Sequence, residues 1–348
     1  MRYLIYTDVH WSTNSSIITS RGEKYSTRLE NLIKSVSWAE RKAEELKCDA
    51  VICLGDFFNK AELNSEEVTA LQEVYWANMP HKFIVGNHES PHKELRYNSV
   101  NVLQKLNFEI ISEVKNEKIT NNISFLYLPY LQDDIRETIA QYKEKFNLIN
   151  PIVLSHNDVA GIQYGPTISK SGIEIDDIEN NCLLFLNGHI HNGVKFCKNG
   201  YNIGNLTGQN FSEDATKYVH PVYVLDITDE GQVNIQIIVN PYAFNFYEFS
   251  ITNMQELTQI RNLGENSVVI VKVIKELLPN LKEEIEHNKN IVQSRIILNL
   301  TAATNNSDEV TIQSLNDIDH LQRFKGFVVD KLGNSDDVIK EINKIIMN

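Results

Sequence analysis

Short apolar runs alternate with stretches of helical periodicity over residues 1–240. This alternation is typical of a layered α/β domain. The helical pattern is clearest at 26–47, where apolar residues recur every three or four positions and would share one helix face. The same reasoning predicts a second helix at 65–77 and strands at 3–7, 50–54, 82–85, 123–128, 152–155 and 183–186.

The pattern changes to strands joined by short turns from about residue 194 onward. Two of these strands, 222–227 and 233–239, flank Asp229-Glu230-Gly231, which is a predicted hairpin turn. After Asn240-Pro241 the sequence predicts a small α+β unit, with strands at 268–273 and 295–300 around a helix at 279–291.

A polar stretch at 301–309 then predicts a linker, and apolar residues return at helical spacing beyond it. We therefore expect three parts: a domain at 1–243, an α+β domain at 244–302, and a linker with C-terminal helices at 303–348.

Five of the apolar runs lead into residues that can bind a metal ion. These residues are Asp8 and His10, Asp56, Asn87 and His88, His156, and His189 and His191. Ligand sites in α/β sheets lie at the carboxyl ends of strands, so we expect these side chains to converge. Each motif alone is a weak signal, because Gly-Asp turns and single histidines are common. Five together favour a metal site.

The mixture of carboxylate, imidazole and amide ligands suits a divalent metal, with manganese expected first and magnesium, iron or zinc as alternatives. Phosphodiester hydrolysis needs an activated water and positive charge facing the phosphate. Two cations about 3.5–4 Å apart supply both. Asp56 is the candidate carboxylate to bridge such a pair, and the sequence thus predicts a two-metal phosphodiesterase.

The signature Asp8-x-His10, Gly55-Asp56, Gly86-Asn87-His88-Glu89, His156 and Gly188-His189-x-His191 resembles that of the calcineurin-like metallophosphoesterases. The resemblance implies a four-layer α-β-β-α sandwich. It implies one metal held by Asp8, His10, Asp56 and His191, and a second held by Asp56, Asn87, His156 and His189. It also implies that His88 is not a ligand but protonates the leaving oxygen or stabilises charge, with Asn87 and Asp56 completing the catalytic set.

A narrower resemblance is to SbcD-type nucleases, among them bacteriophage recombination endonuclease subunits. It rests on Arg28 near the start of the long helix, the glycine-led loop 204–213, the α+β unit as a capping domain that positions DNA, and the C-terminal helices. Asn59 departs from the family's pattern, since some relatives carry a histidine there.

This narrower resemblance implies an exo- or endonuclease that processes DNA ends in recombination, repair and replication. It implies an SbcC-like coiled-coil ATPase partner docked on the C-terminal helices, and a homodimer within a heterotetramer. We expect Arg21, Arg28 and Arg96 to contact the DNA backbone and Phe211 to stack on a base.

The net charge of −13, from 33 basic and 46 acidic residues, argues against binding nucleic acid through overall charge. Two alternatives therefore stay open: a calcineurin-like phosphatase or nucleotide phosphodiesterase acting on a small substrate, and a non-catalytic DNA-tethering scaffold. The chain has no apolar run that approaches the roughly 20 residues needed to span a bilayer, and it begins with a strand rather than a signal peptide. We expect a cytoplasmic protein with no membrane partner.

Overall fold

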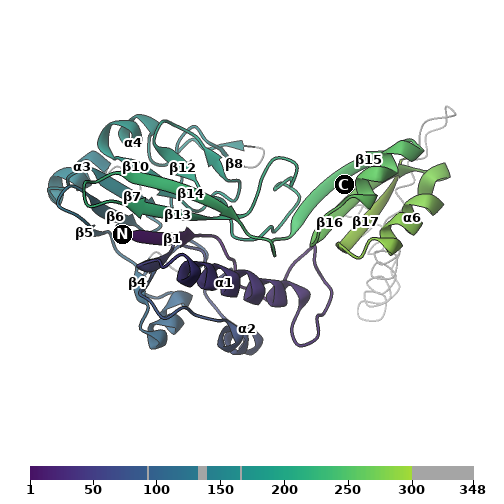
Figure 1. Ribbon diagram of the computed structural model, residues 1–348, viewed down its shortest axis with the longest axis horizontal. Coiled ribbons are helices and arrows are strands. Elements are labelled where there is room, and N and C mark those ends of the chain that lie inside the picture. The colour runs from purple at the N-terminus through teal and green to yellow at the C-terminus, as the bar shows by residue number, and fades with distance from the viewer. Residues whose placement is uncertain (92–93, 132–138, 165–166, 300–348) are drawn as a thin grey trace, which may run out of the picture. The chain divides into compact units, whose positions relative to one another are not determined.

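The computed structural model describes residues 1–91, 94–131, 139–164 and 167–299. The chain divides into two compact units (Figure 1). The first contains Met1–Tyr247 and Glu265–Ser267, and the second contains Glu248–Gly264 and the described residues 268–299. The linker and C-terminal helices expected at 303–348 lie outside the described residues.

Two six-stranded sheets form the centre of the first unit, and each is mostly parallel. The first has the order β14-β13-β1-β2-β3-β4, with bounds Val233–Val239, Pro221–Ile227, Arg2–Tyr6, Ala50–Cys53, His81–Ile84 and Glu109–Ile111. The second has the order β11-β12-β10-β7-β6-β5, with bounds Val194–Lys195, Gly200–Asn202, Leu184–Asn187, Pro151–Ser155, Ser124–Leu128 and Lys115–Lys118.

Helices cover the outer face of each sheet (Figure 1). The first sheet is covered by α1 (Thr27–Glu45), and the second by α3 (Ile139–Lys145) and α4 (Ile175–Asn181). The shorter elements of this unit are α2 (Ser65–Ala70), the 3₁₀ helices η1 (Leu71–Glu73) and η2 (Ser99–Leu106), and the small hairpin of β8 (Gln163–Tyr164) and β9 (Thr167–Ile168).

Three buried apolar clusters hold these layers together. One lies between the sheets and joins residues such as Ile5 and Ile52 of the first sheet to Phe125 and Leu154 of the second. The others pack α1 on the first sheet and α3 and α4 on the second. The expected α-β-β-α sandwich is therefore confirmed.

The long helix begins where its sequence directs it. Ser26 is the N-cap residue, and its hydroxyl accepts a hydrogen bond from Leu29 N at 3.2 Å. The hairpin predicted around Gly231 is also confirmed, because Val222 pairs with Ile238 and Ile227 with Val233 in antiparallel register.

The helix predicted at 65–77 is shorter than expected. It ends as α2 at Ala70, followed by one 3₁₀ turn. The next residues are extended because α1 accepts hydrogen bonds from their amides: Tyr75 N donates to Ser37 Oγ at 3.0 Å and Ala77 N to Glu40 Oε2 at 3.2 Å. These long-range contacts override the local helical pattern.

The second unit, within the described residues, contains a three-stranded sheet and short helices. The strands are β15 (Asn245–Ile251), β16 (Ser267–Ile274) and β17 (Ile291–Asn299), paired in that order. The helices are η3 (Met254–Glu256), α5 (Leu257–Arg261), η4 (Lys275–Leu277) and α6 (Leu278–His287). The sequence did not predict β15 or α5. Among the described residues, no helix has both the length and the apolar character needed to cross a membrane.

Candidate active site

The candidate ligands follow the carboxyl ends of five strands from both sheets. Asp8 and His10 follow β1, Asp56 follows β2, and Asn87 and His88 follow β3 in the first sheet. His156 follows β7 and His189 and His191 follow β10 in the second. Since β1, β2 and β3 are parallel neighbours, as are β7 and β10, each set of strand ends lies at one edge of its sheet.

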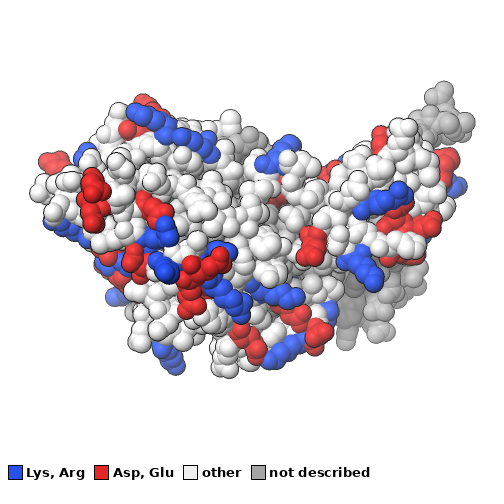
Figure 2. Space-filling view, viewed as in Figure 1, with Lys and Arg blue, Asp and Glu red and all other residues white. Residues whose placement is uncertain are grey.

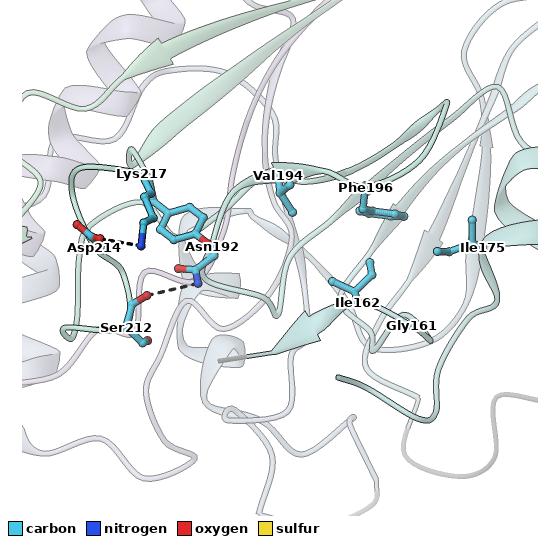
Figure 3. Close-up of a pocket in the computed structure, with 10 residues that line it drawn as sticks. Gly161, Ile162, Ile175, Asn192, Val194, Phe196, Ser212, Asp214 and Lys217 are labelled. Atoms are coloured by element: carbon cyan, nitrogen blue, oxygen red, sulfur yellow. Dashed lines mark hydrogen bonds and ion pairs between the residues drawn. The ribbon is translucent and has the colours of Figure 1, made fainter. Parts of the chain in front are cut away.

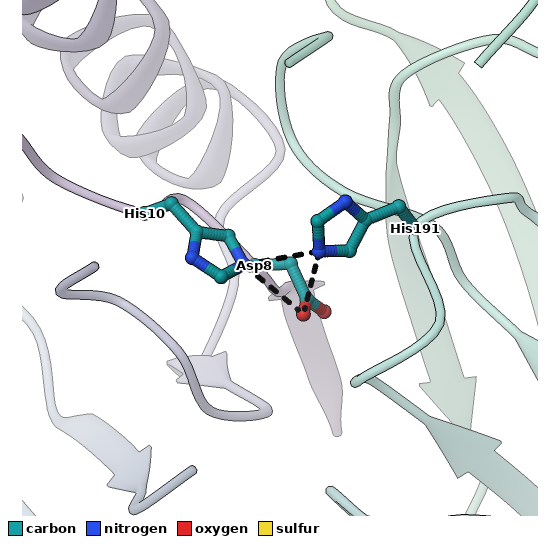
Figure 4. A group of neighbouring side chains, drawn as sticks. All are labelled: Asp8, His10 and His191. Atoms are coloured by element: carbon teal, nitrogen blue, oxygen red, sulfur yellow. Dashed lines mark hydrogen bonds and ion pairs between the residues drawn. The ribbon is translucent and has the colours of Figure 1, made fainter. Parts of the chain in front are cut away.

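A first cluster joins Asp8, His10 and His191 (Figure 4). The two Nε2 atoms of the histidines are 3.1 Å apart. The Oδ1 atom of Asp8 lies 3.7 Å from His10 Nε2 and 3.8 Å from His191 Nε2. One carboxylate oxygen and two imidazole nitrogens therefore face a common point.

A second cluster joins Asp56, His156 and His189, with Asn87 beside it. His156 Nε2 lies 3.1 Å from Asp56 Oδ2 and 3.3 Å from Asn87 Oδ1. His189 Nδ1 lies 3.0 Å from the same amide oxygen. Asp56 Oδ2 is also 3.9 Å from His10 Nε2, so this carboxylate of the second cluster faces the first cluster as well.

His88 lies at the exposed rim of the site, in edge-to-face contact with His10 at a ring separation of 4.8 Å. Its backbone amide donates to Asp56 Oδ1 at 3.0 Å, and its Nδ1 donates to the carbonyl of Asn59 at 3.1 Å. With Nδ1 carrying the proton for that bond, Nε2 is the ring nitrogen left to act on a substrate.

Each clustered histidine uses its remote ring nitrogen to donate a hydrogen bond. The acceptors are Asn59 Oδ1 for His10 (3.0 Å), Glu213 Oε1 for His191 (3.0 Å), the Leu54 carbonyl for His156 (2.7 Å) and Asp158 Oδ1 for His189 (3.3 Å). Such partners fix the tautomer and ring orientation of metal-ligating histidines. Sequence reasoning did not identify Asn59, Asp158 or Glu213 as site residues.

These donor sets fit divalent cations. His10 and His191 donate hydrogen bonds from Nδ1–H to Asn59 and Glu213. The lone pairs of their two Nε2 atoms therefore face each other, with these atoms 3.1 Å apart. Beside them Asp8 Oδ1 is buried without a hydrogen-bond partner. A buried, unpaired carboxylate oxygen and two opposed lone pairs are costly unless a cation lies among them.

Burial and neighbouring charges shift the acidity of the site. Burial lowers the pKa of His10 below its ordinary value. Burial opposes charge on Asp56, yet the adjacent His156 holds the pKa of that carboxyl well below its usual range. Burial together with the charge of Asp56 raises the pKa of Glu89 to about 8. Asp56 is therefore held as an anion, the form that binds a cation.

The backbone of the site is unusual in two ways. Asp8, His10, Asp56 and His189 all have left-handed conformations, with φ of 50°, 48°, 47° and 70°. Glycine precedes Asn87 because a Cβ atom at Gly86 would lie 2.2 Å from Asp56 Oδ1. The ligands at this edge of the sheets therefore lie in left-handed turns, a backbone conformation that costs free energy for residues other than glycine.

Glu213 connects the first cluster to the glycine-led loop 204–213. Its carboxylate is buried, and besides His191 it accepts hydrogen bonds from Asn205 Nδ2, Gln209 N and Asn210 Nδ2 at 3.0, 2.7 and 3.1 Å. Burial of the His191 ring acts to lower its pKa, but the hydrogen bond with Glu213 raises the pKa above its ordinary value.

Arg28 is placed differently from the expectation that it contacts DNA. It is only 4% exposed, and its guanidinium donates to the carbonyls of Gly208 and Val9 at 2.9 and 3.3 Å. The side chain therefore ties α1 to the loop and to the segment between the ligands Asp8 and His10. Buried in these contacts, it does not present its charge to a ligand.

The other expected DNA contacts remain at or near the surface. Arg21 pairs with Glu66 at 2.8 Å, and Arg96 pairs with Glu94 at 2.8 Å while lying over the ring of Tyr97. Phe211 is half-buried and packs edge-to-face on Phe246 at 5.1 Å. None of these side chains belongs to the two ligand clusters.

Comparisons with known proteins identify the family. A sequence model described as Calcineurin-like phosphoesterase matches residues 1–193. No curated protein matches the chain.

Solved structures with a similar fold include a putative 5'-nucleotidase from Staphylococcus aureus in complex with alpha-ketoglutarate, at 13% identity and a TM-score of 0.42. The alignment covers 69% of this chain and 54% of the nucleotidase, so the chain spans about half of that protein. A dimetal phosphatase from Danio rerio aligns at 11% identity and a TM-score of 0.40, over 69% of this chain and 99% of the phosphatase. Since the family model covers more than half of its length, the chain belongs to the calcineurin-like phosphoesterases and is a metal-dependent phosphoester hydrolase.

Proposed function

We propose that the chain is the nuclease subunit of an SbcD-type complex and hydrolyses phosphodiester bonds at DNA ends. The observation that carries the proposal is the geometry around Asp56, whose carboxylate belongs to the second cluster and faces the first as well, while His88 stands at the exposed rim. Such a site can act on a phosphate that approaches from solvent.

The residues divide the chemical work. Asp8, His10, Asp56 and His191 would hold one divalent cation, and Asp56, Asn87, His156 and His189 a second. When bound, such cations lower the pKa of a water and offset charge on the phosphate. His88 Nε2 would stand beside the leaving oxygen and, when protonated, give it a proton, because Asn59 holds the opposite side of the ring.

The chain beyond the family match supports a polymeric substrate. Residues 1–193 carry all of the ligands, yet the described chain continues to a second unit with its own three-stranded sheet. Hydrolysis of a small ester needs no such addition. We infer that this unit helps position DNA, and that residues 303–348 bind an SbcC-like coiled-coil ATPase.

One observation favours the alternative of a small substrate such as a nucleotide or phosphomonoester. The net charge is −13, and Figure 2 shows Lys and Arg intermixed with Asp and Glu over the visible surface of the first unit rather than gathered in a basic stripe. A nuclease of this charge would depend on bound cations and on its partner to attract DNA.

Comparing substrates side by side tests the proposal. With manganese or magnesium, we expect cleavage of single-stranded, blunt or overhanging DNA to exceed hydrolysis of p-nitrophenyl phosphate and cyclic nucleotides in kcat/KM. Preferential hydrolysis of a small ester, with and without a candidate ATPase, would refute the nuclease assignment.

His88→Ala separates chemistry from metal binding. We expect it to retain manganese in calorimetric titration and to lose about 10²–10⁴-fold in kcat, the usual contribution of a general acid. His287→Ala, at the exposed end of α6, is the matched control. Wild-type turnover by His88→Ala would show that this imidazole has no part in the reaction.

A further inference from the structure

A cavity of about 630 Å³ lies in the first unit, and its lining includes residues that are next in sequence to His191 of the first ligand cluster and to Glu213. Asn192, which lines it, follows the ligand His191, and Ser212, which also lines it, precedes Glu213. Consecutive Cα atoms are about 3.8 Å apart. The hydrogen bond of 3.0 Å between His191 and Glu213 therefore fixes this wall of the cavity to the metal-ligand cluster.

The two ends of the cavity differ in chemistry (Figure 3). Ile162, Ile175 and Phe196 gather at one end, and Val194 lies in the middle. Asn192, Ser212, Asp214 and Lys217 gather at the other end. Because Asn192 and Ser212 are the residues next to the cluster, the polar end is the one nearer to His191.

The polar end carries no net charge from its ionic side chains. Lys217 Nζ pairs with Asp214 Oδ2 at 3.2 Å. Asp214 also accepts hydrogen bonds from the backbone amide and hydroxyl of Thr216 at 3.0 and 2.7 Å. Among the described lining residues the cationic group is thus already paired, so a second phosphate would gain little here. A neutral group with polar and apolar parts fits better.

We propose that this cavity is a nucleoside subsite, holding the sugar and base attached to the phosphate under attack. The order of groups matches: phosphate at the ligand clusters, sugar at the polar end beside Asn192 and Ser212, and base among Ile162, Val194 and Phe196. A nucleobase offers flat apolar faces to such side chains. This inference rests on the proposed function and extends it, because it gives the enzyme a preference for nucleotide esters over simple phosphodiesters.

A matched pair of valine substitutions tests the subsite. Val194 is 43% exposed and lines the middle of the cavity, whereas Val239 is 51% exposed on edge strand β14 and does not line it. The readout is the ratio of kcat/KM for thymidine 5′-(p-nitrophenyl phosphate) to that for bis(p-nitrophenyl) phosphate, which has neither sugar nor base. We expect Val194→Trp to lower this ratio about tenfold or more and Val239→Trp to leave it unchanged.

A second variant and a binding measurement guard against misfolding. Phe196→Ala enlarges the apolar end and should lower the same ratio. Saturation-transfer NMR with thymidine, in the absence of metal, should show contact with the wild type and Val239→Trp but not with Val194→Trp. Equal ratios in all proteins would overturn the subsite while leaving the nuclease assignment intact. A wild type that cleaves bis(p-nitrophenyl) phosphate but neither DNA nor thymidine esters would instead overturn the proposed function, and the subsite with it.

Discussion

Removing the charge of Glu213 should weaken one metal position more than the other. Glu213 accepts a hydrogen bond at 3.0 Å from His191, a ligand of the first cluster, whereas the second cluster consists of Asp56, His156 and His189. In the wild type, Gln209 N donates a hydrogen bond to Glu213 Oε2 at 2.7 Å. In Glu213→Gln the amide oxygen can still accept this hydrogen bond. The amide NH₂ would then face His191 Nδ1–H, so two donors oppose each other.

The size of the effect follows from this lost bond. Substitution of the partner of a metal-ligating histidine typically costs 10–100-fold in metal affinity, so we expect about that loss at the first cluster. Glu213→Ala goes further, because four donors lose this acceptor: the buried Asn205 and the half-buried His191, Gln209 and Asn210. We expect it to lower the free energy of unfolding by about 3–5 kcal/mol.

Manganese titration followed by calorimetry and electron paramagnetic resonance separates these effects. We expect the wild type to fill two positions and show a spin-coupled pair. Glu213→Gln should show mainly single, uncoupled manganese at concentrations that saturate the wild type. Glu230→Gln, an exposed carboxylate-to-amide change in a turn, is the control. The reasoning fails if Glu213→Gln forms the coupled pair with wild-type affinity.

Three further predictions concern stability. Chelation of divalent metal should lower the melting temperature in scanning calorimetry, and saturation at 100 times Kd should add about 2.7 kcal/mol to the unfolding free energy; an unchanged melting temperature would contradict the metal site. Arg28→Met should lower the unfolding free energy in urea titration by about 1–3 kcal/mol, since the Gly208 and Val9 carbonyls lose their donor, whereas exposed Arg96→Met should change it by less than about 0.5 kcal/mol. The pKa of Glu117 lies below its ordinary 4.5: burial of the carboxylate acts to raise this pKa, but hydrogen bonds from Lys82 and Tyr127 lower it by more. Its stabilisation is therefore present above pH 4.5 and lost as the pH falls through the lower folded-state value, so wild type and Glu117→Gln should differ by about 1 kcal/mol at neutral pH and converge in acid.

The sequence predicted the layers and the positions of the ligands because both signals are local. An apolar run followed by Asp, Asn or His marks a strand end, and parallel strands bring their ends to one edge without further information. The structure accordingly brings Asp8, His10 and His191 together although they are up to 183 positions apart in numbering. The metal-dependent phosphoesterase family inferred from these motifs is confirmed.

The supporting side chains could not be read from the same pattern. Asn59 contacts His10 across 49 positions and Glu213 contacts His191 across 22, and although the sequence singled out the position of Asn59 and the loop that ends at Glu213, it did not show which ligand each side chain contacts. Arg28 was misjudged for the reverse reason: a basic residue near a helix start suggests solvent, whereas a packed loop carbonyl at Gly208 buries it. The end of α2 likewise depends on acceptors from α1.

Gly86, the glycine before Asn87, has a consequence for how such proteins diverge. Gly86 leaves room for Asp56, so even a methyl group there would push the shared carboxylate out of place. A related protein could therefore lose its hydrolytic activity although its sequence still contains every metal-ligand residue. When inactive copies of this fold are sought, an alanine at this position is as telling a sign of decay as a missing histidine.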